Sequence, residues 1–154
     1  MITPTPSPLI TADLVDLDLA ATDKDTAIAS LAARLHAAGR VTDVDQFLVD
    51  IALREEQMAT GLEGGIGIPH CRSVAVTEPT LAFGRSTAGV DFGAPDGPAH
   101  LIFLIAAPAG SGADHMTVLA ALARRLVRKA FKQTLTEATD PADLASYVNQ
   151  EVGP

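Results

Sequence analysis

Three side chains in the sequence have types and positions suited to phosphoryl chemistry: His70, His115 and Arg54. A neutral imidazole can act as a nucleophile, and a second imidazole and a guanidinium can donate hydrogen bonds to phosphoryl oxygens. If the three side chains converge, they form a small phosphate site in which one histidine is the acceptor. The sequence contains neither a G-x-x-x-x-G-K-[ST] loop nor a protein-kinase motif, so nothing in it indicates a nucleotide cradle.

His70 directly follows the short apolar segment GIGIP, which ends at Pro69. Proline has no backbone N–H to donate, so we expect a strand to stop there and the histidine to stand at its end. Side chains at the ends of buried strands in α/β sheets commonly line ligand sites. Gly64, Gly65 and Gly67 have no side chains, which would let the backbone of another molecule approach. An ordinary loop histidine is the alternative interpretation.

His115 falls in the first turn of a predicted helix, four residues before Leu119 and seven before Leu122. This spacing places the imidazole on the apolar face of the helix, so we expect it to point toward the core side. A helix N-terminus presents unpaired N–H groups and partial positive charge, so an anion is favoured there.

Arg54 lies three residues after Ile51 and seven after Phe47, so it continues the inward face of a second predicted helix at its C-terminal end. A buried guanidinium needs a carboxylate, carbonyl or phosphate partner, because an unpaired buried charge is unfavourable. Bonding to the last carbonyl groups of its own helix is the structural alternative.

Two other chemistries receive less support from the sequence. His70, Cys71 and His115 could ligate zinc, but adjacent residues rarely point at one metal, and no C-x-x-C or H-E-x-x-H spacing is present. Cys71 as a protease nucleophile paired with His115 lacks any accompanying oxyanion signature. We therefore expect Cys71 to be a small core or rim thiol and the protein to need neither a metal nor a cofactor.

The elements that must position these side chains follow from hydrophobic periodicity. We expect extended or strand segments at 9–19, within 61–69, and at 80–84 and 99–106. Helices are expected at 25–38, after Thr42 with a capping-box-like pair to Asp45, after the loop at 108–112, and at 130–137 and 141–149. Because helices and strands interleave, the fold class is α/β, with helices packed on a central sheet.

Composition limits the function further. The chain has 154 residues, 47% of them apolar, which suits one domain with its own core. No apolar run approaches the roughly 18–20 residues of a membrane span. The net charge is −8, and nucleic-acid binding needs a basic surface, so nucleic acid is not expected as a partner. The only basic cluster resembles an exposed helix face; its members are Arg124, Arg125, Arg128, Lys129 and Lys132.

The remaining sequence features indicate a cytoplasmic protein. A single cysteine cannot form an internal disulfide, which suits a reducing compartment. The first residues, MITPTPSP, lack the basic start and apolar stretch of a secretory signal, so we expect residues 1–8 to be a disordered or extended lead-in. His36 and His100 are expected at the edge of the core and are not candidates for chemistry.

Three segments together resemble one known family: TGLEGGIGIPHCR, VDFGAPDGPAHLIFLIAAP and DHMTVLAALARRL. They are similar to the fructose/mannitol-type enzyme IIA domain of the bacterial phosphoenolpyruvate-dependent sugar phosphotransferase system. The resemblance extends over nearly the whole chain, and it implies a single domain at 9–150 with a mixed sheet flanked by helices. Because the sequence stops at Pro154, it also suggests a stand-alone IIA component or an excised domain.

The resemblance implies roles for the three residues above. In the family, the histidine of the apolar-Pro-His motif accepts phosphate from the phosphocarrier protein HPr and passes it to an enzyme IIB of a sugar permease; here that residue is His70. The second family histidine corresponds to His115, and the family arginine that ends the second helix corresponds to Arg54. Around the acceptor we expect an apolar ring formed by Ile66, Ile68 and Met116 for docking.

Two departures and one alternative accompany this resemblance. Glu63 stands where the family commonly has glycine, and we expect it to point to water; Gly67 stands where alanine is usual. The alternative is the nitrogen-related regulatory enzyme IIA, which shares the phosphorylatable histidine but signals by binding proteins. The LIFLIAAP…GADHM pattern favours the fructose-type branch over this one.

Overall fold

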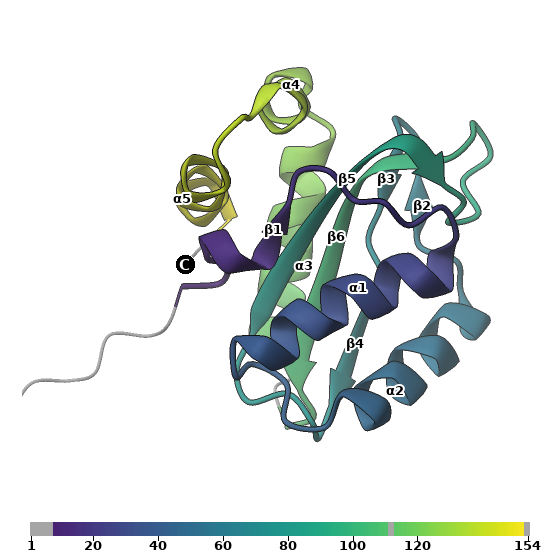
Figure 1. The fold of residues 1–154 in the computed structure, drawn as a ribbon, viewed down its shortest axis with the longest axis vertical. Coiled ribbons are helices and arrows are strands. Elements are labelled where there is room, and N and C mark those ends of the chain that lie inside the picture. Colours follow the sequence, from purple (N-terminus) through teal and green to yellow (C-terminus); the bar gives the residue numbers. More distant parts are fainter. Residues whose placement is uncertain (1–7, 111–112, 153–154) are drawn as a thin grey trace, which may run out of the picture.

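A six-stranded mixed sheet with helices on both faces forms the core of the protein in the computed structural model (Figure 1). The structure describes residues 8–110 and 113–152, of which 113–116 are described by their backbone only. Residues 1–7 of the predicted lead-in lie outside this part. The elements are η1 (Ala12–Leu14), β1 (Val15–Asp16), α1 (Lys24–Ala37), α2 (Val44–Gln57), β2 (Gly61–Leu62), β3 (Ile66–Gly67), β4 (His70–Ser73), β5 (Thr80–Val90), β6 (Ala99–Pro108), α3 (Ala113–Leu126), α4 (Lys129–Glu137) and α5 (Pro141–Val152).

The long strand β6 is the centre of the sheet. The strand order is β1-β5-β6-β3-β2, and β4 also pairs with β6, beyond β3 along the same edge. β5 is antiparallel to β6, whereas β3 and β4 are parallel to it. Every residue from Leu101 to Ala107 is buried, which agrees with the continuous apolar run in the sequence. The prediction of an α/β domain with a sheet flanked by helices is confirmed.

The helices divide between the two faces of this sheet. α1 and α2 cover one face, α3 covers the other, α4 follows at the end of α3, and α5 lies beside β1 (Figure 1). Because α1 packs closely on β5, a Cβ placed on Gly84 would lie 3.0 Å from a Leu19 methyl carbon and 3.4 Å from Leu31. The absence of a side chain at Gly84 is therefore what lets the helix layer approach the sheet.

The predicted helices are all present, with one error in a cap. The α1 stripe of Ile28, Leu31, Ala32 and Leu35 is buried. The cap of α2 is Asp43, whose side chain accepts a hydrogen bond from the backbone N–H of Gln46. The capping box predicted for Thr42 is wrong, because the Thr42 hydroxyl donates to the Ala75 carbonyl instead.

The strands differ more from the prediction. The strand expected at 80–84 continues as β5 to Val90, with a register irregularity between Arg85 and Val90. The segment at 9–19 contains a 3₁₀ turn and only two residues of strand. The glycine-rich stretch forms two short strands, β2 and β3, which pair antiparallel. These short pairings depend on contacts between distant segments, which local periodicity does not report.

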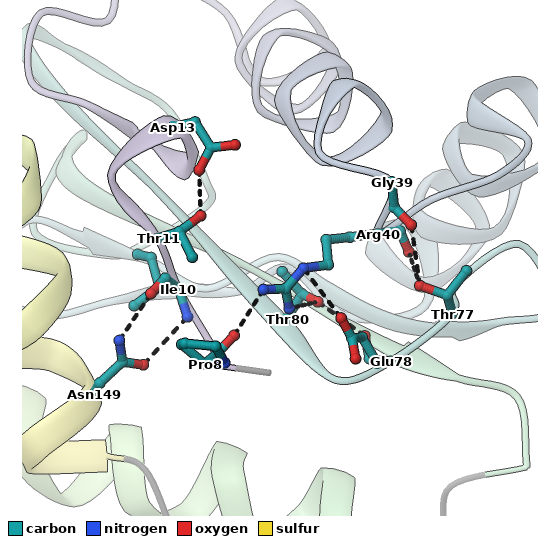
Figure 2. A network of polar contacts seen from close by, with 10 residues as sticks. All are labelled: Pro8, Ile10, Thr11, Asp13, Gly39, Arg40, Thr77, Glu78, Thr80 and Asn149. Atoms are coloured by element: carbon teal, nitrogen blue, oxygen red, sulfur yellow. Dashed lines mark hydrogen bonds and ion pairs between the residues drawn. The ribbon is translucent and has the colours of Figure 1, made fainter. Parts of the chain in front are cut away.

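A polar network fastens the first described residues to the rest of the fold (Figure 2). The buried Arg40 guanidinium donates to the Pro8 carbonyl (2.9 Å) and the Thr80 hydroxyl (3.0 Å), and it is ion-paired with Glu78 (3.3 Å). On α5, Asn149 donates to the Ile10 carbonyl (2.8 Å) and accepts from its N–H (3.3 Å). The segment that starts at Pro8 is thereby held between α5 and the sheet.

Candidate functional site

His70 is the first residue of β4, and its imidazole is held by the backbone. Nδ1 lies 2.8 Å from the carbonyl oxygen of Ile68, two residues earlier. A carbonyl can only accept, so Nδ1 carries the proton of the neutral ring and Nε2 carries the lone pair. The residue is nearly buried, with 8% of its surface exposed.

Backbone pairing with β6 holds the chain around His70 in place. Pro69 separates β3 from β4, and its carbonyl accepts a hydrogen bond from Ile105 N (2.9 Å). His70 is itself paired in register with Ile105. The prediction that His70 stands at the end of a strand is therefore wrong: β3 ends at Gly67, and after Ile68 and Pro69 a second strand begins at the histidine.

The glycines before His70 differ in exposure: Gly67 is buried, Gly65 is half-buried and Gly64 is exposed. A Cβ on Gly67 would lie 2.8 Å from the Phe92 ring, and one on Gly64 would lie 2.8 Å from Lys132 Nζ. Gly64 and Gly65 have positive φ angles of 94° and 78°, which side-chain-bearing residues rarely adopt. These glycines therefore serve the turn and internal packing, and the predicted approach of a foreign backbone at Gly67 is wrong. Glu63 is exposed, as predicted.

Arg54 is exposed on the last turn of α2, so the prediction that it faces inward is wrong. No hydrogen bond or ion pair of its guanidinium is found within the described part of the chain, so the alternative of capping its own helix is also unsupported. The inward position of this turn is taken by the next residue, Glu55, which is buried together with Phe47 and Ile51. A cation that is exposed in this way can reach an incoming anion.

α2 and β4 run in opposite directions, which brings the Arg54 end of the helix toward His70. Thr42 N donates to the Ala75 carbonyl (2.8 Å), so the start of α2 lies next to the residues after β4. Further along the helix, Asp50 accepts a hydrogen bond from Ser73 at the end of β4. Arg54 follows Asp50 on the helix and His70 precedes Ser73 on the strand, so both lie on the same side of this contact.

His115 occupies the first turn of α3, as its sequence position predicts. Its side chain lies outside the described residues, and the same holds for Met116. The backbone at the start of α3 follows β6 in the chain. The contact between the side chains of His115 and His70 stays a prediction.

Sequence reasoning missed two polar residues behind the candidate site, Glu55 and Thr60. Each has only 6% of its surface exposed, and the Thr60 hydroxyl donates to Glu55 Oε1. Lys24 Nζ lies 3.5 Å from the other carboxylate oxygen. The four-residue spacing of Phe47, Ile51 and Glu55 was the signal in the sequence that could have shown Glu55 to be buried.

Cys71 is a core thiol. Only 5% of its surface is exposed, and burial, with a smaller contribution from the negative charge of Asp50, raises the pKa of the thiol from its ordinary value to about 12. A thiolate is the reactive form of cysteine, so this pKa argues against a nucleophilic role at neutral pH. The prediction of a core thiol is confirmed.

Apolar side chains exposed near the site come from α2 and the segment that follows it. Val49, Leu53, Met58 and Leu62 have exposed fractions of 55%, 54%, 63% and 37%. The apolar ring predicted from Ile66 and Ile68 is wrong, because both residues are buried in the core. No helix in the described part of the chain has the length and hydropathy of a membrane span.

Comparison with known proteins gives a consistent family assignment. Residues 8–151 match the family described as "Phosphoenolpyruvate-dependent sugar phosphotransferase system, EIIA 2". The chain is 42% identical over 127 residues to the PTS system fructose-specific EIIA component of Haloferax volcanii, covering 82% of each protein. It is 36% identical over 143 residues to the fructose-specific EIIABC component of Bacillus subtilis, covering 92% of this chain but 22% of that longer protein.

Solved structures agree. Nitrogen regulatory protein IIA-Ntr from Neisseria meningitidis superposes with a TM-score of 0.82 at 26% identity, covering 91% of this chain and 96% of that one. The IIA mannitol protein of Escherichia coli, solved in complex with phosphorylated enzyme IIB mannitol, has a TM-score of 0.73 at 24% identity and covers 91% and 97%. The second likeness concerns the fold alone.

Proposed function

This chain belongs to the EIIA 2 family of the phosphoenolpyruvate-dependent sugar phosphotransferase system, and we propose on that premise that it is a cytoplasmic phosphoryl relay protein. It accepts phosphate from phospho-HPr on His70 and passes it to a fructose-type enzyme IIB for sugar uptake. We assign this activity to residues 9–150. The fructose-specific relatives support the sugar class, and the IIA–IIB mannitol complex supports enzyme IIB as the partner.

The observation that carries this proposal is the hydrogen bond from His70 Nδ1 to the Ile68 carbonyl (2.8 Å). It holds the ring in one orientation and leaves the lone pair on Nε2, the nitrogen farther from the backbone. A nucleophile whose tautomer is already set needs no rearrangement before it attacks. This is the arrangement that a phosphoacceptor imidazole requires.

The transfer step is an in-line exchange between two nitrogens. The Nε2 lone pair forms a bond to phosphorus while the bond from phosphorus to the donor nitrogen breaks, and the donor leaves with that electron pair. The Nδ1 proton stays in its hydrogen bond to Ile68 throughout. Such a transfer needs positioning and stabilisation of the equatorial oxygens more than covalent chemistry from the protein.

Arg54 and His115 are the residues we assign to those oxygens. The exposed Arg54 guanidinium, near the His70 end of β4, would form charge-assisted hydrogen bonds to the phosphoryl group once it arrives. His115, at the start of α3, would add an imidazole donor at a helix end that favours anions. We propose that these two groups stabilise phosphohistidine and support onward transfer.

The exposed apolar side chains of α2 offer a docking surface for the donor and acceptor proteins. Val49 and Leu53 are four residues apart, so they share one face of α2 outside the core, and Met58 and Leu62 follow in the chain. Burying this surface removes apolar area from water, which favours association. Both protein partners must reach the same histidine, so one shared surface would serve both.

A second candidate function is that of a nitrogen-related regulatory enzyme IIA. The TM-score of 0.82 to IIA-Ntr supports it. We favour the transport role because the identity to the fructose-specific EIIA component is 42%, against 26% to IIA-Ntr.

Reconstitution tests the proposal directly. Incubation with phosphoenolpyruvate, enzyme I and HPr should place one acid-labile phosphate on the protein, and phosphopeptide mapping should assign it to His70. Addition of a fructose-type enzyme IIB should then discharge that phosphate. Phosphate elsewhere in the chain would contradict the assignment of the acceptor, while stable phosphorylation without discharge to any fructose-type IIB would favour the regulatory function.

A further inference from the structure

A relay of contacts connects the buried carboxylate of Glu55 to the imidazole of His70. Glu55 Oε1 accepts a hydrogen bond from the Thr60 hydroxyl. The Thr60 carbonyl accepts from Ile68 N (3.0 Å), and the Ile68 carbonyl accepts from His70 Nδ1 (2.8 Å). Each residue in this relay is buried or nearly so, with exposed fractions between 6% and 9%.

The carbonyl that fixes the His70 tautomer is therefore held at two points. On the N-terminal side, the bond between Ile68 N and the Thr60 carbonyl anchors the residue. On the C-terminal side, the bond from Ile105 N to the Pro69 carbonyl anchors the next peptide to β6. The second anchor is a bond to the central strand β6. The first lies next to the short pairing of β2 with β3, and it also depends on how the Thr60 segment is placed after the end of α2.

Glu55 helps to place the Thr60 segment, together with the bond from Gly61 N to the Phe92 carbonyl (2.9 Å). The Glu55 side chain is 3% exposed, and a carboxylate buried to this extent needs partners, because burial of an unpaired charge is unfavourable. The partners are the Thr60 hydroxyl and the Lys24 ammonium at 3.5 Å. A charge-assisted hydrogen bond in a buried site is stronger and better directed than one between neutral groups.

We propose that Glu55 is a positioning residue for the phosphoacceptor: through Thr60 and Ile68 it holds the His70 ring with its proton on Nδ1. This inference rests on the proposed function for its consequence, since the held tautomer presents the Nε2 lone pair for transfer. Glu55 touches neither phosphate nor partner. It acts through the backbone, as the outer partners of a catalytic histidine do when they fix its tautomer.

The test measures the tautomer and the transfer rate separately. ¹⁵N chemical shifts of the His70 ring report which nitrogen is protonated in the neutral form, and phosphorylation by phospho-HPr gives the rate. Thr60→Val keeps the side-chain volume and removes the hydroxyl, while Glu55→Met removes the acceptor. We expect both variants to show a mixture of tautomers and a rate lower by about 10–100-fold, the range for loss of such outer partners.

Conservative variants and controls separate positioning from general stability. Thr60→Ser and Glu55→Gln keep the donor and the acceptor of the relay, so both should retain the single tautomer. Lys24→Met removes the ion pair to Glu55 but keeps the hydrogen bonds of the relay, so this variant should also retain the single His70 tautomer. Ser86→Ala removes another buried hydroxyl, one that accepts from Gly89 N (2.9 Å), and should change neither measurement.

A wild-type tautomer in both Thr60→Val and Glu55→Met overturns the inference, whatever happens to their melting temperatures or rates. If Glu55→Met does not fold, Thr60→Val alone decides. Failure of the proposed function has a different signature: the wild-type protein itself would not be phosphorylated on His70, while the ring shifts of the variants would still show whether Glu55 sets the tautomer.

Discussion

Asp50 on α2 accepts a hydrogen bond from Ser73 on β4, and this bond joins the helix that carries Arg54 to the strand that begins at His70. Ser73 is buried, and its hydroxyl also accepts from Ala75 N (3.2 Å). The helix and the strand are therefore fixed to each other by a polar contact at the end away from the candidate phosphoacceptor. The last turn of α2 carries Arg54, whose side chain is exposed.

His70→Ala should abolish phosphorylation by phospho-HPr, because the variant lacks the imidazole that we propose as the acceptor. The measurement is incorporation of acid-labile phosphate from labelled phosphoenolpyruvate. His100→Ala is the matched control: His100 is exposed, and its Nδ1 also contacts a carbonyl, that of Ser86 at 2.9 Å. The control should be phosphorylated like the wild type, and retained labelling of His70→Ala would disprove the assignment.

Arg54→Ala should weaken the phosphorylated state and leave the fold almost unchanged. Its side chain is exposed, so the free energy of unfolding should change by no more than about 0.5 kcal/mol. Loss of charge-assisted hydrogen bonds should lower the phosphorylated fraction at equilibrium with HPr. Urea denaturation and a phosphorylation equilibrium separate the two effects, with the exposed Arg128→Ala as control. A large loss of stability with normal phosphorylation would indicate a structural role instead.

His115→Ala should accept phosphate but transfer it poorly. The helix start at Ala113 offers backbone N–H groups to the phosphoryl oxygens, so the acceptor step should persist without the imidazole. The onward step needs the oxygens held in line with the incoming IIB nucleophile. Stopped-flow or rapid-quench discharge to enzyme IIB measures this step, and a wild-type rate would remove His115 from the mechanism.

Cys71 should make the protein less stable at alkaline pH. Burial raises the pKa of the thiol in the folded protein to about 12, from about 9.0 for an exposed thiol, so the thiol loses its proton first in the unfolded chain. The protonated Cys71 thiol makes its full contribution to the free energy of unfolding below pH 9, and this contribution is lost as the pH rises toward 12. Within that window the free energy of unfolding should fall by about 1.4 kcal/mol per pH unit from this group.

The measurement is urea denaturation at several alkaline pH values, with Cys71→Ala as the comparison. Other groups titrate in the same window, so the difference between the two proteins is the informative quantity. A difference that stays constant from pH 8 to pH 11 would mean that the thiol is not held protonated by the fold.

The sequence was sufficient to predict the helices and the class of fold. The α1 stripe and the continuous apolar run of β6 are local patterns, and each matches its buried residues. The cap of α2 was misplaced by one residue because Thr42 and Asp43 are both good caps in isolation. The deciding contact is the Thr42 bond to Ala75, which comes from a distant part of the chain.

The site was harder to predict for the same reason. The prediction chose Arg54 as the inward residue of α2, whereas the four-residue spacing of Phe47 and Ile51 continues to Glu55, which is the buried residue. Thr60 and Lys24 provide partners for the carboxylate, and sequence spacing does not reveal them. Pro69 correctly marked a break in pairing, but pairing resumes at once because β6 continues past it.

The side chain of Asn149 forms hydrogen bonds to the backbone N–H and the carbonyl of Ile10, so the first and last described segments lie next to each other. Circular permutation is well tolerated when the ends of a fold lie together and the new opening falls in an exposed turn. A short linker between these segments, with the chain reopened near Gly97, where added side-chain atoms would meet nothing within 4 Å, should give a rearranged protein with the same core. The new chain ends would lie near Gly97, so fusion partners would be attached there and no longer beside Ile10 and Asn149.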